Sequence, residues 1–509
     1  MDPIADRLIG RTLTDDQWTQ LQLPGPLGGC GLRLPSSTMD AALWASWAAH
    51  EPAARRLSST MQRQADHSGA DKAAEAAAAA LRTHGIIVEP GAQPRRTQEA
   101  HDTFHAGPWA TEMPAAPRAG AAPRYMGATL QLLEGHRATQ LWTTMSASDR
   151  THYLSTGGSR TGMTWTAIPD AAIRSLPDAH WRCATLDRLN MLTARPGTCC
   201  GLPRAHHRGG TCGRQLDRRL RHVWHCRTAV ARLRIHHAVN NALARELRIA
   251  RGNVDVERSM PDMAKRKAEG TLEEAIMDLT VWFPGAVEWH GVDVTIRFPG
   301  AARYTGASYR PGRAATKAEE EKIARYGRDV LPIAYETGGR LGAHSTLSIK
   351  RLAQLAAQAA GGLTTPQSLE TRWRRALEAS LLFAIADAYI LALGGEQAAE
   401  LAKSQPTATH TPSADTPGDP AAPPSLTASA PASTSGTGTV PMHVDLEASM
   451  AELLEAELGD LFRQDELVAE EWHCTSQPAC SSGGSAGCIA PARPASTRHP
   501  PRVEGPPTS

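Results

Sequence analysis

Four residues of types that bind zinc lie close together in one basic part of the chain. They are Cys200, Cys212, His222 and Cys226, separated by 11, 9 and 3 residues. Structural zinc sites take four Cys or His ligands in a tetrahedron, and the compact His-x3-Cys pair suits closure on one ion. The spacing leaves two alternatives open, since Cys199 could be the first ligand and His225 could replace His222. Reduced, half-buried thiols in a basic loop are the simpler interpretation.

Arginine surrounds these residues. Between Gly201 and Arg251 there are 12 Arg and only two acidic residues. Local positive charge attracts phosphate through counterion release, so the segment favours nucleic-acid binding over an ordinary solvated face. A bound metal would fix the backbone and aim guanidinium groups at phosphates. The arginines expected to do this are Arg218, Arg219, Arg221 and Arg227.

A series of carboxylates follows the basic segment. Asp278 and Asp293 each lie inside a short apolar run, IMDLTV and GVDVTI. Acids at strand ends are common, but a buried unpaired carboxylate is costly, which favours a function for these two. Two carboxylates on adjacent strands suit Mg²⁺, which can polarise a phosphodiester and activate water. The sequence therefore predicts a magnesium-dependent phosphodiester-cleaving site.

Other residues are expected to assist these two acids. Glu257 is a candidate third acid, Lys322 could reach the water or the developing charge, and Tyr326 follows one helical turn later. Asp262 is a competing first aspartate, ranked lower because its surroundings are loop-like and 30 residues separate it from Asp293.

Short β-branched runs and helical periodicity predict the elements that would position the acids. Strands are expected at 254–257, 276–283, 292–298 and 330–335, and helices at 229–248, 316–326, 346–361 and 366–395. The predicted class is α+β or α/β, with a mixed sheet flanked by helices.

Composition divides the chain further. We expect a helical region over 1–150 with a linker near 90–125, the Cys/His segment over 171–251, and the carboxylate domain over 252–395. Residues 404–509 are expected to be disordered, apart from an acidic amphipathic helix at 445–472 that could dock on a partner or on the body of the chain.

The bulk properties exclude some classes. No apolar run of 18 residues was found by inspection, so no membrane partner is expected. The polar N-terminus and the clustering of four of the nine Cys predict an intracellular protein rather than a secreted disulfide framework.

The order of these segments resembles the C-terminal part of non-LTR retrotransposon polyproteins that carry a restriction-like endonuclease. Residues 23–34 (LPGPLGGCGLRL) are similar to the segment after the polymerase, and residues 156–169 (TGGSRTGMTWTAIP) to a stretch before the zinc knuckle. Residues 212–226 (CGRQLDRRLRHVWHC) resemble the knuckle itself. His236 falls where the family has a histidine that contacts nucleic acid, between Ile235 and His237 where the family has Arg and Asn.

The resemblance covers roughly residues 20–355 and implies a nuclease of the PD-(D/E)xK type. Asp278 matches the first catalytic aspartate, with Met277 where the family has Pro, and Asp293 matches the second. Lys322 and Tyr326 match a lysine displaced to the following helix, and residues 335–340 (YETGGR) resemble the stretch that closes the domain.

The function implied is target-DNA nicking with Zn²⁺ and Mg²⁺ in the nucleus, with an RNA template as a second partner. No Tyr/Phe-x-Asp-Asp polymerase signature is present, so a polyprotein piece without its polymerase is expected. The alternatives are a catalytically inactive nucleic-acid-binding module and an interaction protein acting through helix 445–472.

Overall fold

The computed structural model describes residues 9–60, 68–109, 125–158, 161–166, 176–204, 210–226, 231–266, 272–286 and 288–402. The chain divides into two compact units, residues 1–413 and 414–509, and every described residue belongs to the first. The acidic helix expected at 445–472 therefore lies outside the described residues.

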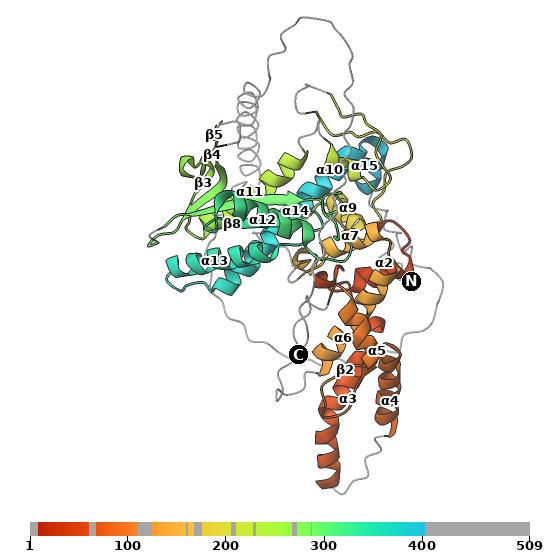
Figure 1. Ribbon diagram of the computed structural model, residues 1–509. Coiled ribbons are helices and arrows are strands. Elements are labelled where there is room, and N and C mark those ends of the chain that lie inside the picture. Colours follow the sequence, from red (N-terminus) through yellow and green to blue (C-terminus); the bar gives the residue numbers. More distant parts are fainter. Residues whose placement is uncertain are drawn as a thin grey trace, which may run out of the picture. The chain divides into compact units, whose positions relative to one another are not determined.

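A four-stranded mixed sheet forms the centre of the carboxylate region (Figure 1). In spatial order its strands are β3 (Asn253–Ser259), β6 (Ile276–Trp282), β7 (His290–Arg297) and β8 (Leu331–Glu336). The β3–β6 and β6–β7 pairs are antiparallel, and the β7–β8 pair is parallel. These strands overlap the four runs predicted from sequence, and the α+β class is confirmed.

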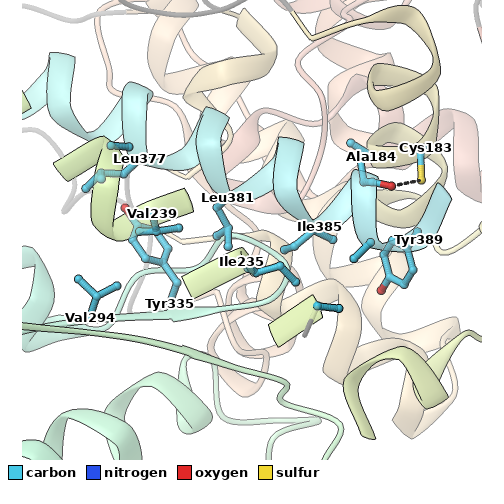
Figure 2. Packing of buried hydrophobic residues seen from close by; sticks show 14 of the residues in the cluster. Cys183, Ala184, Ile235, Val239, Val294, Tyr335, Leu377, Leu381, Ile385 and Tyr389 are labelled. Atoms are coloured by element: carbon cyan, nitrogen blue, oxygen red, sulfur yellow. Dashed lines mark hydrogen bonds between the residues drawn. The ribbon is translucent and has the colours of Figure 1, made fainter. Parts of the chain in front are cut away.

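Alternation along the strands separates two faces of the sheet. On β7, Val292 and Val294 belong to the main core, whereas Asp293 between them points to the opposite face. The main core lies beneath α11 (Ala231–Ile249) and α14 (Pro366–Leu393). Figure 2 shows Ile235 and Val239 of α11 beside Leu381 of α14 within this core.

Helix α12 (Arg313–Tyr326) connects β7 to β8 and covers the opposite face, where Ala315 and Ala318 pack on Ala334. Helix α13 (Ala343–Ala359) follows β8 and packs against that strand and α14. A parallel strand pair needs such a crossover, so α12 is fixed relative to both strands.

The remaining helices precede or flank the sheet. They are α2 (Asp15–Gln22), α3 (Pro35–Thr60), α4 (Ser68–Thr83), α5 (Gln98–Ala106), α6 (Tyr125–Thr144), α7 (Ala147–Thr156), α8 (Met163–Thr166), α9 (Asp178–Arg188), α10 (Arg221–His225) and α15 (Gly395–Ala402). Short two-residue strands form two small ribbons, β1 (Ile86–Ile87) with β2 (Arg95–Arg96), and β4 (Lys265–Arg266) with β5 (Leu272–Glu273).

The prediction of a linker near residues 90–125 is wrong for the first half of that range. β2 and α5 lie within it, and α5 begins at the N-cap Thr97, whose side chain accepts a hydrogen bond from the Ala100 N–H. Phe104 of α5 is buried, so the helix has an apolar contact that holds it in place. Residues 110–124 lie outside the described part of the chain.

The main core crosses the domain boundaries expected from sequence. Leu13, Trp18 and Leu21 from the N-terminal segment belong to the same buried cluster as the sheet and α14. Buried Glu378 of α14 accepts hydrogen bonds from the backbone N–H groups of residues 162–164, at 2.6–3.4 Å. The three expected domains therefore share one core, because apolar residues from all of them belong to a single buried cluster.

Helix α14 is long and apolar enough to cross a membrane, with a mean hydropathy of 1.8 over its most apolar window. This helix does not stand out in the sequence as one uninterrupted apolar run, because charged residues interrupt its first half. In the structure 72% of this window is buried against the rest of the protein, which is the environment of a core helix.

Candidate active site

The zinc candidates come together. One side-chain atom each from Cys200, Cys212, His222 and Cys226 lie within 4.8 Å of one another, and the Cys212 Sγ is 3.4 Å from the His222 Nε2. Tetrahedral Zn²⁺ with thiolate and imidazole ligands places neighbouring donor atoms about 3.4–3.8 Å apart. The three thiols and the imidazole therefore fit one zinc ion with little rearrangement.

Local backbone pairing produces this cluster. The Cys200 N–H donates to the Arg214 carbonyl at 2.7 Å, and the Cys212 N–H donates to the Leu202 carbonyl at 2.9 Å. This irregular antiparallel ribbon places the first two cysteines side by side. Gly201 packs against α14, where an added Cβ would lie 2.5 Å from the Leu391 carbonyl oxygen, so only glycine fits.

The other two ligands are set by a short helix. The Asp217 carboxylate accepts the backbone N–H groups of Arg221 and His222 at 3.1 and 2.7 Å, which fixes the start of α10. His222 lies on this helix and Cys226 follows its last residue. An acid at a helix N-terminus is favourable electrostatically, and it also orders the backbone of the arginines beside it.

Both alternatives that the sequence left open are decided by burial. Cys200 is 1% exposed and belongs to the cluster, whereas Cys199 is exposed. His225 is exposed and contacts the Phe298 ring edge-on rather than the thiols. Burial and the neighbouring thiols raise the pKa of Cys200 to about 12, a cost that a bound metal cation would remove.

The arginines around the zinc candidates take different places. Arg219 forms an ion pair with Asp149 at 3.0 Å and donates to the Asn190 carbonyl, and Arg221 hydrogen-bonds the Ser148 hydroxyl. Arg218 is exposed. Arg227 lies outside the described residues.

The two aspartates lie where β6 and β7 separate. Ladder pairing between these strands ends at Leu279 and Val292, and the next residues in register are Asp278 and Asp293. Beyond this point β7 continues beside β8 alone. The Asp278 Oδ2 accepts the Val294 N–H at 2.6 Å, so a carboxylate replaces the missing backbone partner.

Asp293 is 2% exposed and forms an ion pair with Lys322 of α12. The Lys322 Nζ lies 2.7 Å from Oδ1 and 2.9 Å from Oδ2, and the contact with Oδ2 has hydrogen-bond geometry. The Lys322 side chain is 24% exposed, so it reaches the aspartate from the solvent side. This is the contact that was expected between an aspartate of the sheet and a lysine of the following helix.

His236 lies beside the acid cluster, and its contact with nucleic acid stays a prediction. Its Nε2 lies 3.2 Å from both the Asp278 Oδ2 and the Val294 carbonyl oxygen. Both partners are acceptors, so Nε2 carries a proton. His236 therefore braces β6 and β7 from α11, although its side chain remains 22% exposed.

The charges of this cluster act on one another. Burial and the Asp278 charge raise the pKa of Asp293 to about 6, against the opposing effects of Lys322 and His236. Burial alone would lower the pKa of His236, but its hydrogen bond to Asp278 and the two nearby carboxylates raise it. Two carboxylates share a small volume with a lysine and an imidazole.

The remaining candidates lie near this cluster or outside it. Glu257 falls between Val256 and Arg258, which pair with Leu279 and Met277 of β6, but it has a φ of 53° and its carboxylate is 3.8 Å from the His237 Nδ1. Tyr326 packs beside Lys322, with the Nζ 5.6 Å from its ring centroid. Asp262 lies exposed in the 3₁₀ turn Pro261–Met263, away from these contacts.

Sequence reasoning missed two residues that position the cluster. Asn240, one turn after His236 on α11, is fully buried and donates to the Asp278 carbonyl at 3.4 Å. Glu336 at the end of β8 accepts the Ala314 and Ala315 N–H groups at 2.8 and 3.4 Å, which caps α12. The i, i+4 spacing of His236 and Asn240 on an apolar helix face was the available signal.

No protein-family model matches the chain, and no curated protein matches it.

Proposed function

We propose that the chain is a metal-dependent DNA endonuclease whose active centre contains Asp278, Asp293 and Lys322. The observation that carries the proposal is the placement of two carboxylates at the point where paired strands separate, with an ammonium group 2.7 Å from one of them. Phosphodiester cleavage needs acids that hold a hard cation and a positive group near the developing charge.

The carboxylates suit Mg²⁺. The Asp293 Oδ1 lies 2.7 Å from the Lys322 Nζ without hydrogen-bond geometry, and Asp278 uses Oδ2 for its contacts with Val294 and His236. The Asp278 Oδ1 and, once Lys322 turns away, the Asp293 carboxylate would offer the oxygen ligands that Mg²⁺ prefers. Bound Mg²⁺ would supply a polarised phosphate and an activated water.

The residues of the chain have separate tasks. Asp278 and Asp293 would hold the cation, and His236 and the Val294 N–H orient the Asp278 carboxylate toward the cluster. Lys322 neutralises Asp293 in the free protein and would turn to the water or the phosphate oxygens once the cation is bound. Tyr326 limits the directions open to the Lys322 side chain.

The Cys200/Cys212/His222/Cys226 cluster would hold a structural zinc ion in the same proposal. Arg221 on its short helix and the exposed Arg218 before that helix give it a positive surface suited to a DNA target, with RNA as a second possible ligand. These features agree with the resemblance to the restriction-like endonuclease region of non-LTR retrotransposon polyproteins, an identification that rests on short motifs.

Nicking of supercoiled plasmid in Mg²⁺ tests the proposal. Asp293→Asn should abolish nicking while DNA retention persists, because the cation site is lost but the basic surface is not. Asp262→Asn is the matched control, since Asp262 is exposed and outside the cluster. Undiminished nicking by Asp293→Asn would refute the assignment.

A nucleic-acid-binding module with an inactive nuclease site is the second candidate. The Lys322–Asp293 ion pair favours it, because this pair satisfies the buried acid without a metal. It predicts DNA binding that weakens with salt and no cleavage with any divalent cation. The remaining candidate is an interaction protein that uses helix 445–472. Deleting residues 404–509 tests it, because this deletion would remove partner binding and leave nucleic-acid binding intact.

A further inference from the structure

A cavity of about 310 Å³ lies between the zinc segment and the loop that follows β7. Its walls come from parts of the chain far apart in sequence. The start of α7 contributes Ser148 and His152, the zinc segment contributes Arg219 and Arg221, and the loop contributes residues 298–308. The proposed cleavage site does not use this cavity.

One wall of the cavity is suited to phosphate. No described carboxylate pairs with the Arg221 side chain, which hydrogen-bonds only the neutral Ser148 hydroxyl. Arg219 beside it is held by Asp149 and by the Asn190 carbonyl. A guanidinium group that hydrogen-bonds a neutral hydroxyl is not neutralised by it, so its positive charge is available to a bound anion. Arginine is also the residue best suited to binding phosphate.

Aromatic residues also line the cavity. They are Phe298, Tyr304 and Tyr389, and Phe298 is stacked on Trp224 at a centroid distance of 5.9 Å and an interplanar angle of 10°. The Trp224 indole N–H donates to the Tyr389 hydroxyl at 2.9 Å, which fixes both rings. Asp187 also lines the cavity, and burial raises its pKa.

The volume of the cavity and the residues that line it indicate what the cavity can bind. Ligand cavities run from about 300 to 1,000 Å³, so this one admits a single small group and excludes a double helix. A charged group together with aromatic rings suits a phosphate joined to a planar base. The loop begins directly after β7, the strand that carries Asp293.

From this arrangement we infer that the cavity between α7, the zinc segment and the 298–308 loop binds one unpaired nucleotide of the nucleic-acid strand, with its phosphate on Arg221. The inference rests on the proposed nucleic-acid function and names the form of substrate, a strand that is locally unpaired beside the cleavage site. A free nucleoside monophosphate has the same chemistry and is the other source to be tested.

Fluorescence anisotropy without Mg²⁺ tests the inference on the full chain with zinc bound. The probes are a blunt duplex and a duplex of equal length with a short single-stranded overhang. The wild type should prefer the overhang by about tenfold, the effect of one stacked base or one charged hydrogen bond. Arg221→Gln should remove this preference.

Arg218→Gln is the matched control, because Arg218 lies on the same segment but outside the cavity lining. Arg218→Gln should weaken the binding of both probes equally and keep the preference for the overhang. Ala302→Leu fills the cavity from its exposed loop without altering charge, and it should also remove the preference, which keeps the test decisive if Arg221→Gln folds poorly.

The outcomes separate the two proposals. If the wild type binds neither probe, the proposed nucleic-acid function fails. If it binds both probes equally, or if Arg221→Gln and Ala302→Leu both retain the preference, the cavity inference alone is overturned. Binding of a free nucleoside monophosphate at least as tight as the overhang, and dependent on Arg221, would also overturn it in favour of a small-molecule site.

Discussion

At the scale of single residues, the two sites depend on groups whose burial is costly without a partner. Three buried thiols and one imidazole face one another in the zinc segment, and the buried Asp293 of the sheet pairs with Lys322 of α12. Such arrangements lower stability in the free protein and are retained where a ligand uses them.

The purified chain should contain one zinc ion. Cys200→Ser should lower the zinc content to near zero and lower the melting temperature, because a buried ligand of the cluster is lost. Cys199→Ser is the matched control and should retain the metal, since Cys199 is exposed. Metal analysis and thermal unfolding measure both, and equal zinc loss in the two variants would contradict the ligand assignment.

The stability of the metal-free carboxylate site should depend on pH. The folded-state pKa of Asp293 is about 6, above the ordinary value of 3.8, so the native state binds this proton more tightly than the unfolded state does. Its contribution therefore decreases as pH rises from 4 to 7. Relative to Asp293→Asn, the wild type should lose about 1–3 kcal/mol of unfolding free energy over this range.

Urea unfolding at several pH values, without added Mg²⁺, measures this difference. A difference between wild type and Asp293→Asn that stays constant with pH would show that the aspartate is not protonated more readily in the folded chain.

At the scale of elements, the position of Lys322 is set by the ends of α12. Glu336 caps the first turn of this helix, and Glu319 in its middle accepts the Ser345 N–H at 2.6 Å and lies too close to Gly342 for any side chain there. α12 is therefore bound to β8 and α13 at fixed points. The lysine that meets Asp293 is placed by these contacts and not by its own sequence context.

Removing the cap should change both stability and activity. Glu336→Ala should lower the free energy of unfolding by about 1–3 kcal/mol, because two buried N–H groups lose their acceptor, and should reduce nicking. Glu336→Gln should restore most of the stability, since an amide oxygen also accepts. Exposed Glu320→Ala on the same helix is the control, and an equal loss in that variant would argue against the cap.

At the scale of the whole molecule, the N-terminal segment and the sheet form one folding unit. Buried Arg188 donates to the Gly25 and Gly29 carbonyls at 3.1 and 2.8 Å, and buried Arg340 donates to the Leu154 carbonyl at 2.6 Å. These bonds join the glycine-rich N-terminal turn and α7 to the body of the protein. A fragment beginning near residue 171 would expose the core that they cover.

Deleting residues 1–35 should therefore lower the melting temperature strongly or prevent folding, since each large apolar side chain removed from the core costs about 2–5 kcal/mol. Deleting residues 414–509, a separate unit, should leave the melting temperature unchanged. Thermal unfolding, followed with a dye that binds exposed apolar surface, compares the melting temperatures of the two truncated chains. Equal stability of the two truncated chains would contradict a shared core.

The local part of this structure could be predicted from sequence. Strands β6, β7 and β8 overlap alternating or β-branched runs, and their existence follows from local preference. The grouping of Asp278 with Asp293 was also accessible, because the 14 residues between these two aspartates permit an antiparallel pair. The expected linker was wrong because a Pro- and Ala-rich composition does not reveal a helix held by a cap and one buried Phe.

What the sequence determined was the chemistry: which thiols, imidazoles and carboxylates occur, and the short elements that carry them. The tertiary structure decided between Cys199 and Cys200 and placed His236 in contact with Asp278. It also formed a cavity from α7, the zinc segment and the loop after β7. The reason is physical, because burial and ion pairing depend on contacts between segments up to hundreds of residues apart, which no local pattern encodes.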